Sequence, residues 1–137
     1  MTQQGRSYTG AAGIGAPVTG EALVAHDNFS ARYDLDRIRG VFSRPQHKLY
    51  GQSYVGKVLV LNIAKGGVAT AWMLREMVDR GMAPAALILN AANPIMAQGA
   101  AFANLPLIDR FGVDITAVIR SGERVHVDPP RATLSVI

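Results

Sequence analysis

The hydrophobic pattern divides the middle of the chain into two buried strands with a helix between them. Residues 58–63 and 85–89 are almost continuous apolar runs, as expected of strands that are buried on both faces of a sheet. Residues 68–80 carry apolar side chains at helical spacing, and Gly81 and Pro84 follow where a helix would end. This order of elements predicts a parallel βαβ unit.

The predicted helix has a broad apolar face. Its members are Ala71, Leu74, Met77 and Val78, together with Trp72. We expect much of this face, including the tryptophan, to pack in the core rather than to bind a cofactor.

Shorter elements are expected before and after this unit. The predicted set is a strand at residues 22–25, a helix from Asn93-Pro94 to about residue 104, an apolar run at 105–108, a strand at 115–119 and a hairpin of 124–128 with 132–136. Residues 26–50 are polar and irregular, and a loop of this length is usually functional or part of an interface. The predicted fold class is α/β, with a parallel βαβ core joined to a barrel-like set of short strands.

Composition limits the number of domains, the location and the chemistry that we expect. A chain of 137 residues, 49% hydrophobic and 18% charged, is expected to fold as one domain, which we place at residues 11–137 after an N-terminal tail at residues 1–10. No apolar run is long enough to span a bilayer and the first residues lack a signal-peptide pattern, so we expect a cytoplasmic protein with no membrane partner. With no cysteine, the chain has no disulfide, no thiolate nucleophile and no cysteine metal ligand.

The formal net charge is +4, and the basic residues are scattered, with the densest group at residues 32–48. A basic protein attracts anionic substrates or nucleic acid. No aromatic-rich strand motif accompanies this group, so a solvated loop is the better interpretation. Nucleic-acid binding is therefore the weakest hypothesis, and we expect no nucleic-acid partner.

The best candidate for a binding site is the turn between the first buried strand and the helix. Gly66 and Gly67 permit a tight turn that directs free backbone N–H groups and the positive end of a helix dipole at one place, which suits a carboxylate or a phosphate. Lys65 adds a positive charge, and Thr70 offers a hydroxyl group in the first helical turn. The spacing matches neither a Walker loop nor a dinucleotide fingerprint, and glycine pairs also occur in purely structural turns.

Histidines are the next candidates. His26 is followed by Asp27, but adjacent side chains usually point apart, which argues against a catalytic dyad. His47 lies in the long loop, and His126 lies in the C-terminal hairpin, where an exposed or hydrogen-bonded residue is expected. The His, Asp and Glu residues show no spacing typical of a metal site.

Several segments carry a pattern in their order and spacing. Residues 20–23 read GEAL, residues 47–53 read HKLYGQS, residues 56–61 read GKVLVL and residues 81–86 read GMAPAA, with Asp34 closing a segment between the first two. Together they resemble the swivel domain, or small subunit, of the aconitase X family over nearly the whole chain.

The resemblance implies a swivelling-domain-like β/β/α fold and a role as one part of a hydro-lyase. Family members dehydrate cis-3-hydroxy-L-proline or phosphomevalonate, and a larger domain or subunit carries an iron–sulfur cluster. The cluster would then be bound by a partner large subunit and not by this cysteine-free chain, which would close over the partner's site.

The resemblance also implies roles for individual residues toward a small hydroxy-acid or phosphate-bearing substrate. The implied substrate-binding residues are Lys65, Gly66, Gly67, Val68, Asp34 and Arg32, and Thr70 is the candidate catalytic residue.

The chain departs from the family at the glycine turn. The family loop usually reads G-S-S or G-S-C, and its serine positions fall on Gly67 and Val68, which have no hydroxyl group. Backbone donation to an anion survives this change, whereas proton transfer by a serine side chain does not. A second hypothesis is therefore a non-catalytic swivel homologue that binds a partner protein or a small anion.

Overall fold

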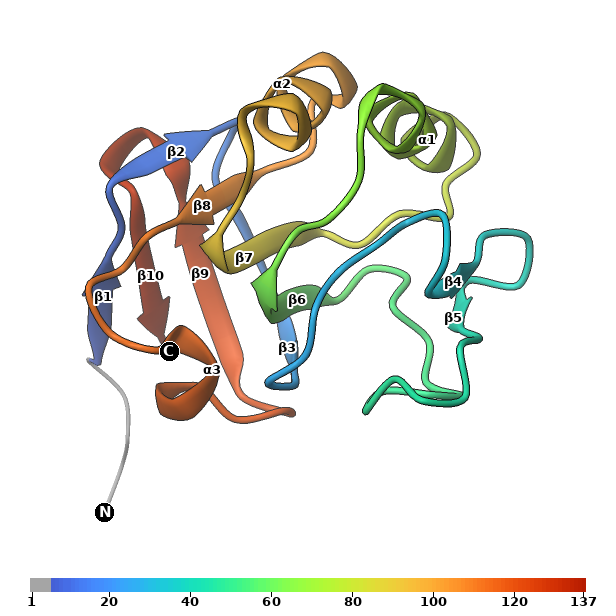
Figure 1. Cartoon of the computed structure of the whole chain (residues 1–137). Coiled ribbons are helices and arrows are strands. Elements are labelled where there is room, and N and C mark those ends of the chain that lie inside the picture. The colour runs from blue at the N-terminus through green and yellow to red at the C-terminus, as the bar shows by residue number, and fades with distance from the viewer. Residues whose placement is uncertain (1–5) are drawn as a thin grey trace.

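The computed structural model describes residues 6–137 as a mixed sheet flanked by helices (Figure 1). The sheet strands are β1 (Ser7–Thr9), β2 (Ala12–Ile14), β3 (Val18–Val24), β6 (Val58–Ile63), β7 (Ala86–Ala91), β8 (Leu107–Asp109), β9 (Arg124–Asp128) and β10 (Thr133–Val136). They follow the order β1-β10-β9-β3-β6-β7-β8-β2, in which β3, β6, β7 and β8 are parallel and the remaining pairs are antiparallel.

Two long helices cover one face of this sheet, and a short helix lies against the other (Figure 1). The helices are α1 (Val68–Asp79), α2 (Pro94–Ala103), α3 (Ile115–Val118) and the 3-10 turn η1 (Pro129–Arg131). The long loop after β3 contains the hairpin of β4 (Leu35–Asp36) with β5 (Val41–Phe42). The predicted parallel βαβ unit is therefore confirmed as β6, α1 and β7.

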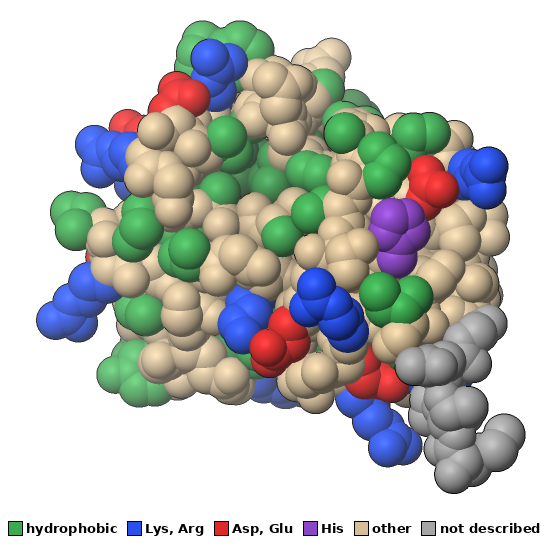
Figure 2. All heavy atoms as spheres, turned by 180° about the vertical axis from the view of Figure 1, so that it is seen from behind, with side chains coloured by type: hydrophobic (Ala, Val, Ile, Leu, Met, Phe, Trp, Pro, Cys, Tyr) green, Lys and Arg blue, Asp and Glu red, His purple; other side chains and the backbone are tan. Residues whose placement is uncertain are grey.

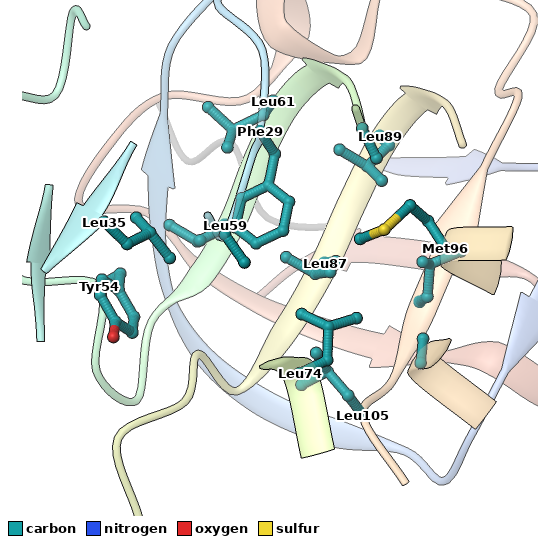
Figure 3. Packing of buried hydrophobic residues seen from close by; sticks show 14 of the residues in the cluster. Phe29, Leu35, Tyr54, Leu59, Leu61, Leu74, Leu87, Leu89, Met96 and Leu105 are labelled. Carbon is teal, nitrogen blue, oxygen red and sulfur yellow. The ribbon is translucent and has the colours of Figure 1, made fainter. Parts of the chain in front are cut away.

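The central strands are apolar on both faces because each face is buried. Leu59 and Leu61 of β6 pack in the cluster beneath α1 and α2, together with Leu74 and Met96 of those helices (Figure 3). The alternate residues of β6, including Val60, pack in a second cluster with α3, β9 and β10. A strand with two buried faces has an almost continuous hydrophobic sequence, which explains the pattern of residues 58–63.

Helix α2 begins and packs as its sequence suggests. The Asn93 side chain caps the helix by accepting a hydrogen bond from the Met96 amide at 2.8 Å, and Pro94 occupies the first turn. Gly99 faces α1, where an added Cβ would lie 2.6 Å from Ala71 Cβ. Gly99, which weakens the helix by propensity, therefore permits the close approach of the two helices.

Two predictions of local structure are wrong. The strand predicted at residues 115–119 is instead the short helix α3 at residues 115–118, because Asp114 caps the Thr116 amide at 3.0 Å and the Ile115 amide donates to Asn90 Oδ1 at 2.9 Å. These polar contacts outweigh the strand preference of a β-branched run. Trp72 is not in the core: it is 61% exposed and packs edge-to-face on Phe102, with 5.0 Å between ring centroids.

The start of the domain also differs from expectation. Ser7–Thr9 form β1 and pair with β10, so these residues of the predicted tail belong to the sheet. Residues 7–9 are ordered as a strand because the free edge of β10 offers unpaired backbone groups with which they pair. Residues 1–5 lie outside the described residues, and the remaining domain boundaries stay a prediction.

The sheet is strongly curved. β1 and β2 stand at opposite ends of the strand order, yet in the sequence they are separated by just two residues, Gly10 and Ala11. The Gly10 amide donates to Ala132 O at 2.7 Å and the Ala11 amide to Asp109 O at 3.0 Å, which ties this crossing to both edges. Closure into a barrel-like arrangement stays a prediction. Within residues 6–137, no helix has the length and apolar character needed to cross a membrane.

Candidate functional site

The candidate site lies where the parallel strands end. After β3, the chain continues beside β6: the Asn62 amide donates to Asp27 O at 2.8 Å, the Phe29 amide to Ile63 O at 2.9 Å and the Lys65 amide to Phe29 O at 2.8 Å. Phe29 is fully buried, which anchors this added segment. The start of the long loop is thereby fixed next to the glycine turn. This place lies at the carboxyl ends of the parallel strands, where ligands usually bind in α/β sheets.

An open pocket of about 340 Å³ lies between the long loop and the glycine turn. Its lining residues are Asn28, Ser30, Tyr33, Asp34, Arg44, Lys65 and Gly66. We call this hollow the loop pocket.

The glycine turn lies between β6 and α1, as its place in the sequence predicts. Gly66 has a φ of +126°, which strongly favours glycine, and Thr70 packs directly beneath it, with Oγ1 2.5 Å from the position of an added Cβ. Gly67 is the N-cap residue of α1 and gives no side-chain cap, and the first turn has no acidic residue. The amino end of α1 is therefore a positive end of a helix dipole without a carboxylate to balance it.

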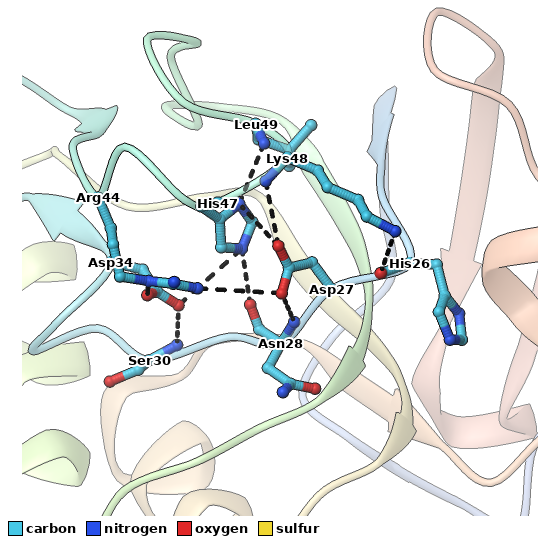
Figure 4. A network of polar contacts seen from close by, with 9 residues as sticks. All are labelled: His26, Asp27, Asn28, Ser30, Asp34, Arg44, His47, Lys48 and Leu49. Carbon is cyan, nitrogen blue, oxygen red and sulfur yellow. Dashed lines mark hydrogen bonds and ion pairs between the residues drawn. The ribbon is translucent and has the colours of Figure 1, made fainter.

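A polar network supports the loop behind the pocket (Figure 4). The side chain of His47 is fully buried; its Nδ1 accepts from the Leu49 amide at 3.1 Å, so Nε2 carries the proton that it donates to Asn28 O at 2.7 Å. Asp34 accepts from the Ser30 amide at 3.0 Å and from Arg44 Nε at 2.5 Å. Both carboxylate oxygens of Asp34 are thus engaged within the protein.

Two charged groups of this network have shifted pKa values. Burial alone would raise the pKa of Asp27, but hydrogen bonds from the Lys48 and Asn28 amides, together with the nearby Arg44 guanidinium, lower it below its usual value. The hydrogen bond from Arg44 to Asp34 raises the pKa of the Arg44 guanidinium. Asp27 and Arg44 therefore stay charged in the folded protein across the physiological pH range.

Lys65 differs from Arg44 in its surroundings. Arg44 lies against Asp34 and within 3.9 Å of Asp27, so acidic neighbours balance its charge. Lys65 is exposed at the pocket, and no acidic partner for it is present within residues 6–137. The loop pocket consequently has a positive rim that attracts an anionic group.

The structure brings together three of the seven residues predicted for the site. Lys65, Gly66 and Asp34 line the loop pocket. Gly67 and Val68 are exposed at the start of α1, and Val68 lines a separate apolar hollow between α1 and α2.

The last two predicted residues lie apart from the pocket lining. Arg32 places its guanidinium 5.3 Å from the ring centre of Tyr33 and is not a lining residue. Thr70 is 3% exposed beneath Gly66.

Sequence reasoning missed Arg44, Asn28, Ser30 and Tyr33 as pocket residues. The available signal was positional: Arg44 lies in the densest basic group, and the other three lie in the segment that ends at Asp34. Which loop residues face the pocket depends on pairing with β6, which a single sequence does not display.

The other predicted histidines lie elsewhere. His26 hydrogen-bonds with Thr116 at 2.9 Å, next to Asp114, and His126 with Thr19 at 2.9 Å. Hydrogen bonds from Thr116 and Asn90 lower the pKa of Asp114. On the face seen in Figure 2, Lys and Arg side chains are dispersed among acidic ones, which does not match a continuous basic stripe for nucleic acid.

An iron–sulfur cluster does not fit the residues of this chain. The sequence has no cysteine, and the described residues include no group of three His, Asp or Glu side chains placed to hold a metal ion. The chain's own groups are suited to binding an anion.

Fold and pocket together define a small α/β domain with a glycine turn and a polar pocket at the carboxyl ends of its parallel strands. The family model for the aconitase X swivel domain matches residues 7–136. The phosphomevalonate dehydratase small subunit of Methanothrix thermoacetophila is 38% identical over 117 residues, which cover 85% of each chain. That of Methanocella arvoryzae is 34% identical over 114 residues, 83% of this chain and 86% of the relative.

Solved structures agree with the sequence comparisons. The crystal structure of holo aconitase X from Thermococcus kodakaraensis superposes with a TM-score of 0.88 at 27% identity, over 97% of this chain and 99% of that one. A solution NMR structure of a UPF0107 protein gives a TM-score of 0.86 at 26% identity, over 96% and 99%. The chain belongs to the aconitase X swivel domain family.

Proposed function

We propose that this chain is the small subunit of an aconitase-X-type dehydratase and that the loop pocket binds the anionic end of a hydroxy-acid substrate. The observation that carries the proposal is Lys65 beside the Gly66 turn, without an acidic partner among residues 6–137, in a chain whose relatives are named phosphomevalonate dehydratase small subunits. Phosphomevalonate is the first candidate substrate, since its phosphate and carboxylate suit such a turn. A cytoplasmic location is part of the same proposal.

The turn contributes backbone donors and one positive charge in this proposal. The backbone N–H groups of Gly66, Gly67 and Val68 donate to the carboxylate or phosphate, and the Lys65 ammonium adds attraction. Asp34 holds Arg44 and the loop in place through its two internal hydrogen bonds. Arg32 is exposed and reaches the substrate only from the rim.

Dehydration needs groups that this chain lacks. A hydro-lyase removes a proton from one carbon and a hydroxyl group from its neighbour, which leave together as water. We assign the iron–sulfur cluster to a large subunit, because this chain has no cysteine. The assembled enzyme then has its site between the two subunits, with this chain as the side that binds the anion.

Thr70 remains the candidate catalytic hydroxyl of this chain. Its burial beneath Gly66 means that the turn must open before Oγ1 meets a substrate. A Thr70→Val variant, which keeps the side-chain volume and removes the hydroxyl, lowers turnover of the complex if Thr70 takes part. Turnover equal to that of the native enzyme removes Thr70 from the mechanism.

Co-purification with the large subunit tests the proposal. We expect the chain, expressed in its native host, to recover a larger cysteine-containing protein in equal amount, with iron and sulfide in the eluate. The complex should dehydrate phosphomevalonate or cis-3-hydroxy-L-proline. Recovery of the chain alone, free of iron, contradicts the proposal.

A non-catalytic swivel homologue is the second candidate, and the lack of a hydroxyl at Gly67 and Val68 favours it. It predicts no dehydratase activity in a reconstituted complex whose cluster is intact. Gly67→Ser separates the two candidates further, since an added Cβ at Gly67 meets no atom within 4 Å. If Gly67 is a lost catalytic position, this substitution raises dehydration in the complex.

A further inference from the structure

The loop pocket contains a hydroxyl group that the glycine turn does not supply. Ser30 is 7% exposed and lies in the pocket wall with Lys65 and Gly66. Gly67 has no side chain and Thr70 is buried beneath the turn. Among the residues that line the pocket, Ser30 is the one with an aliphatic hydroxyl group.

The backbone fixes Ser30 beside Lys65. Phe29 and Ala64 form a parallel bridge, and Ser30 and Lys65 are the next residue of each segment. The Lys65 amide is held by Phe29 O at 2.8 Å, and the Ser30 amide by Asp34 Oδ2 at 3.0 Å. Neighbouring segments in this register keep the serine and the lysine side by side at the carboxyl end of the sheet.

The hydroxyl of Ser30 has an unused donor. Its Oγ accepts a long hydrogen bond of 3.3 Å from the Tyr33 amide, and among the described residues no acceptor receives its hydrogen. In the same wall, Asn28 Oδ1 is buried without a hydrogen-bond partner among residues 6–137. A buried acceptor without a partner is unfavourable, so a ligand that donates to Asn28 Oδ1 and accepts from the Ser30 hydroxyl would use both groups.

Charge selects the ligand's acceptor. Lys65 is the cation of the pocket without an acidic partner in the described chain, whereas Arg44 is held by Asp34. Because Ser30 follows Phe29 and Lys65 follows Ala64 in the bridged segments, we expect an anionic oxygen beside Lys65 to meet the serine hydroxyl. The hydroxyl group of a hydroxy acid offers the donor that Asn28 Oδ1 lacks. Both groups occur together in a hydroxy acid.

We propose that Ser30 is a substrate-binding residue whose hydroxyl donates a hydrogen bond to an anionic oxygen of the hydroxy acid, next to Lys65. This inference rests on the anion-binding part of the proposed function. Ser30 thereby supplies a side-chain hydroxyl contact at a turn that itself provides only backbone donors.

Binding to the full chain is the first test. In an NMR titration with phosphomevalonate, Ser30→Ala should weaken binding about tenfold, the typical effect of losing one hydrogen bond to a charged group. Its melting temperature should stay close to that of the native chain, because the lost bond to the Tyr33 amide is long. Ser43→Ala, at an exposed serine outside the pocket lining, should change neither quantity.

A chemical test covers the case in which Ser30→Ala does not fold. The chain has no cysteine, so Ser30→Cys introduces a single thiol of nearly the same size. Phosphomevalonate should slow alkylation of this thiol by iodoacetamide and leave alkylation of a Ser43→Cys control unchanged. Inorganic phosphate in place of phosphomevalonate shows whether the phosphate group alone protects.

The outcomes distinguish this inference from the proposed function. If the complex turns over phosphomevalonate while the Ser30 variants bind and react as the native chain does, Ser30 is not a contact and the dehydratase proposal stands. If the complex is inactive but the ligand protects at Ser30, the contact stands and the dehydratase proposal fails. Absence of binding by the native chain and by its complex overturns both.

Discussion

At the scale of single residues, the two adjacent glycines of the turn do different work. Gly66 needs its lack of a side chain, because its φ is +126° and Thr70 fills the space beneath it. Gly67 has ordinary extended backbone and open space around it. The sequence treats them as a pair, whereas the structure gives Gly66 a conformational role and leaves Gly67 free to vary.

This difference predicts opposite effects of two substitutions on stability. Gly66→Ala should lower the free energy of unfolding by about 1–3 kcal/mol through backbone strain and contact with Thr70. Gly67→Ser should raise it by a few tenths of a kcal/mol, because serine caps a helix slightly better than glycine. Urea denaturation of the two variants measures both. Equal effects of the two substitutions would contradict this account of the turn.

At the scale of elements, contacts between helices decide what propensity does not. Gly99 lies in the middle of α2, where glycine normally weakens a helix by about 1 kcal/mol relative to alanine. Its contact with Ala71 of α1 explains the choice, since an added Cβ would lie 2.6 Å from Ala71 Cβ and 2.8 Å from Ala71 Cα. A residue that is unfavourable for its own helix is thus required by the neighbouring one.

We therefore expect Gly99→Ala to destabilise the protein, although helix propensity alone predicts the reverse. Overpacking between α1 and α2 should lower the free energy of unfolding by about 1–3 kcal/mol. Gln98→Ala, at the adjacent exposed position, is the matched control and should change stability by less than about 0.5 kcal/mol. A higher melting temperature for Gly99→Ala would show that the helices separate without penalty.

At the scale of the whole molecule, the long loop after β3 runs beside the end of β6 and forms one wall of the loop pocket. The network of Asp27, Asp34, Arg44 and His47 fixes a segment that has little regular secondary structure of its own. The pKa of Asp27 is lower in the folded state than in the unfolded chain, where it is about 4. The charged carboxylate therefore stabilises the folded protein at pH values above about 4. This contribution is lost as the pH falls through the folded pKa.

Asp27→Asn should accordingly make stability less sensitive to acid. At pH 7 the variant should be less stable by on the order of 1 kcal/mol, because it loses the charge that accepts from the Asn28 and Lys48 amides. The difference should shrink as the pH falls below about 4 and the carboxyl group of the native protein becomes protonated. Thermal melts across this range measure it, with Asp79→Asn at an exposed helix position as the control. A difference that is constant with pH would exclude the carboxylate as its source.

Local signals in the sequence were enough for the central elements. The apolar runs, the Asn93-Pro94 start and the glycine at the end of α1 act over a few residues, and the βαβ unit and α2 follow from them. The glycine turn was predicted for the same reason, and Lys65 and Gly66 do lie at a pocket.

Tertiary structure alone decided the rest. The hydrogen bond from the Ile115 amide to Asn90, a residue of β7, favours α3 over the predicted strand, and pairing beside β6 selects Ser30 and Asn28 as pocket residues. Trp72, predicted in the core, is two residues from Leu74 and so points away from the buried face of α1, where it packs on Phe102. The contacts of Asn90 with α3 and of the long loop with β6 join residues distant in the chain, and the pattern within one segment carries no information about such neighbours in space.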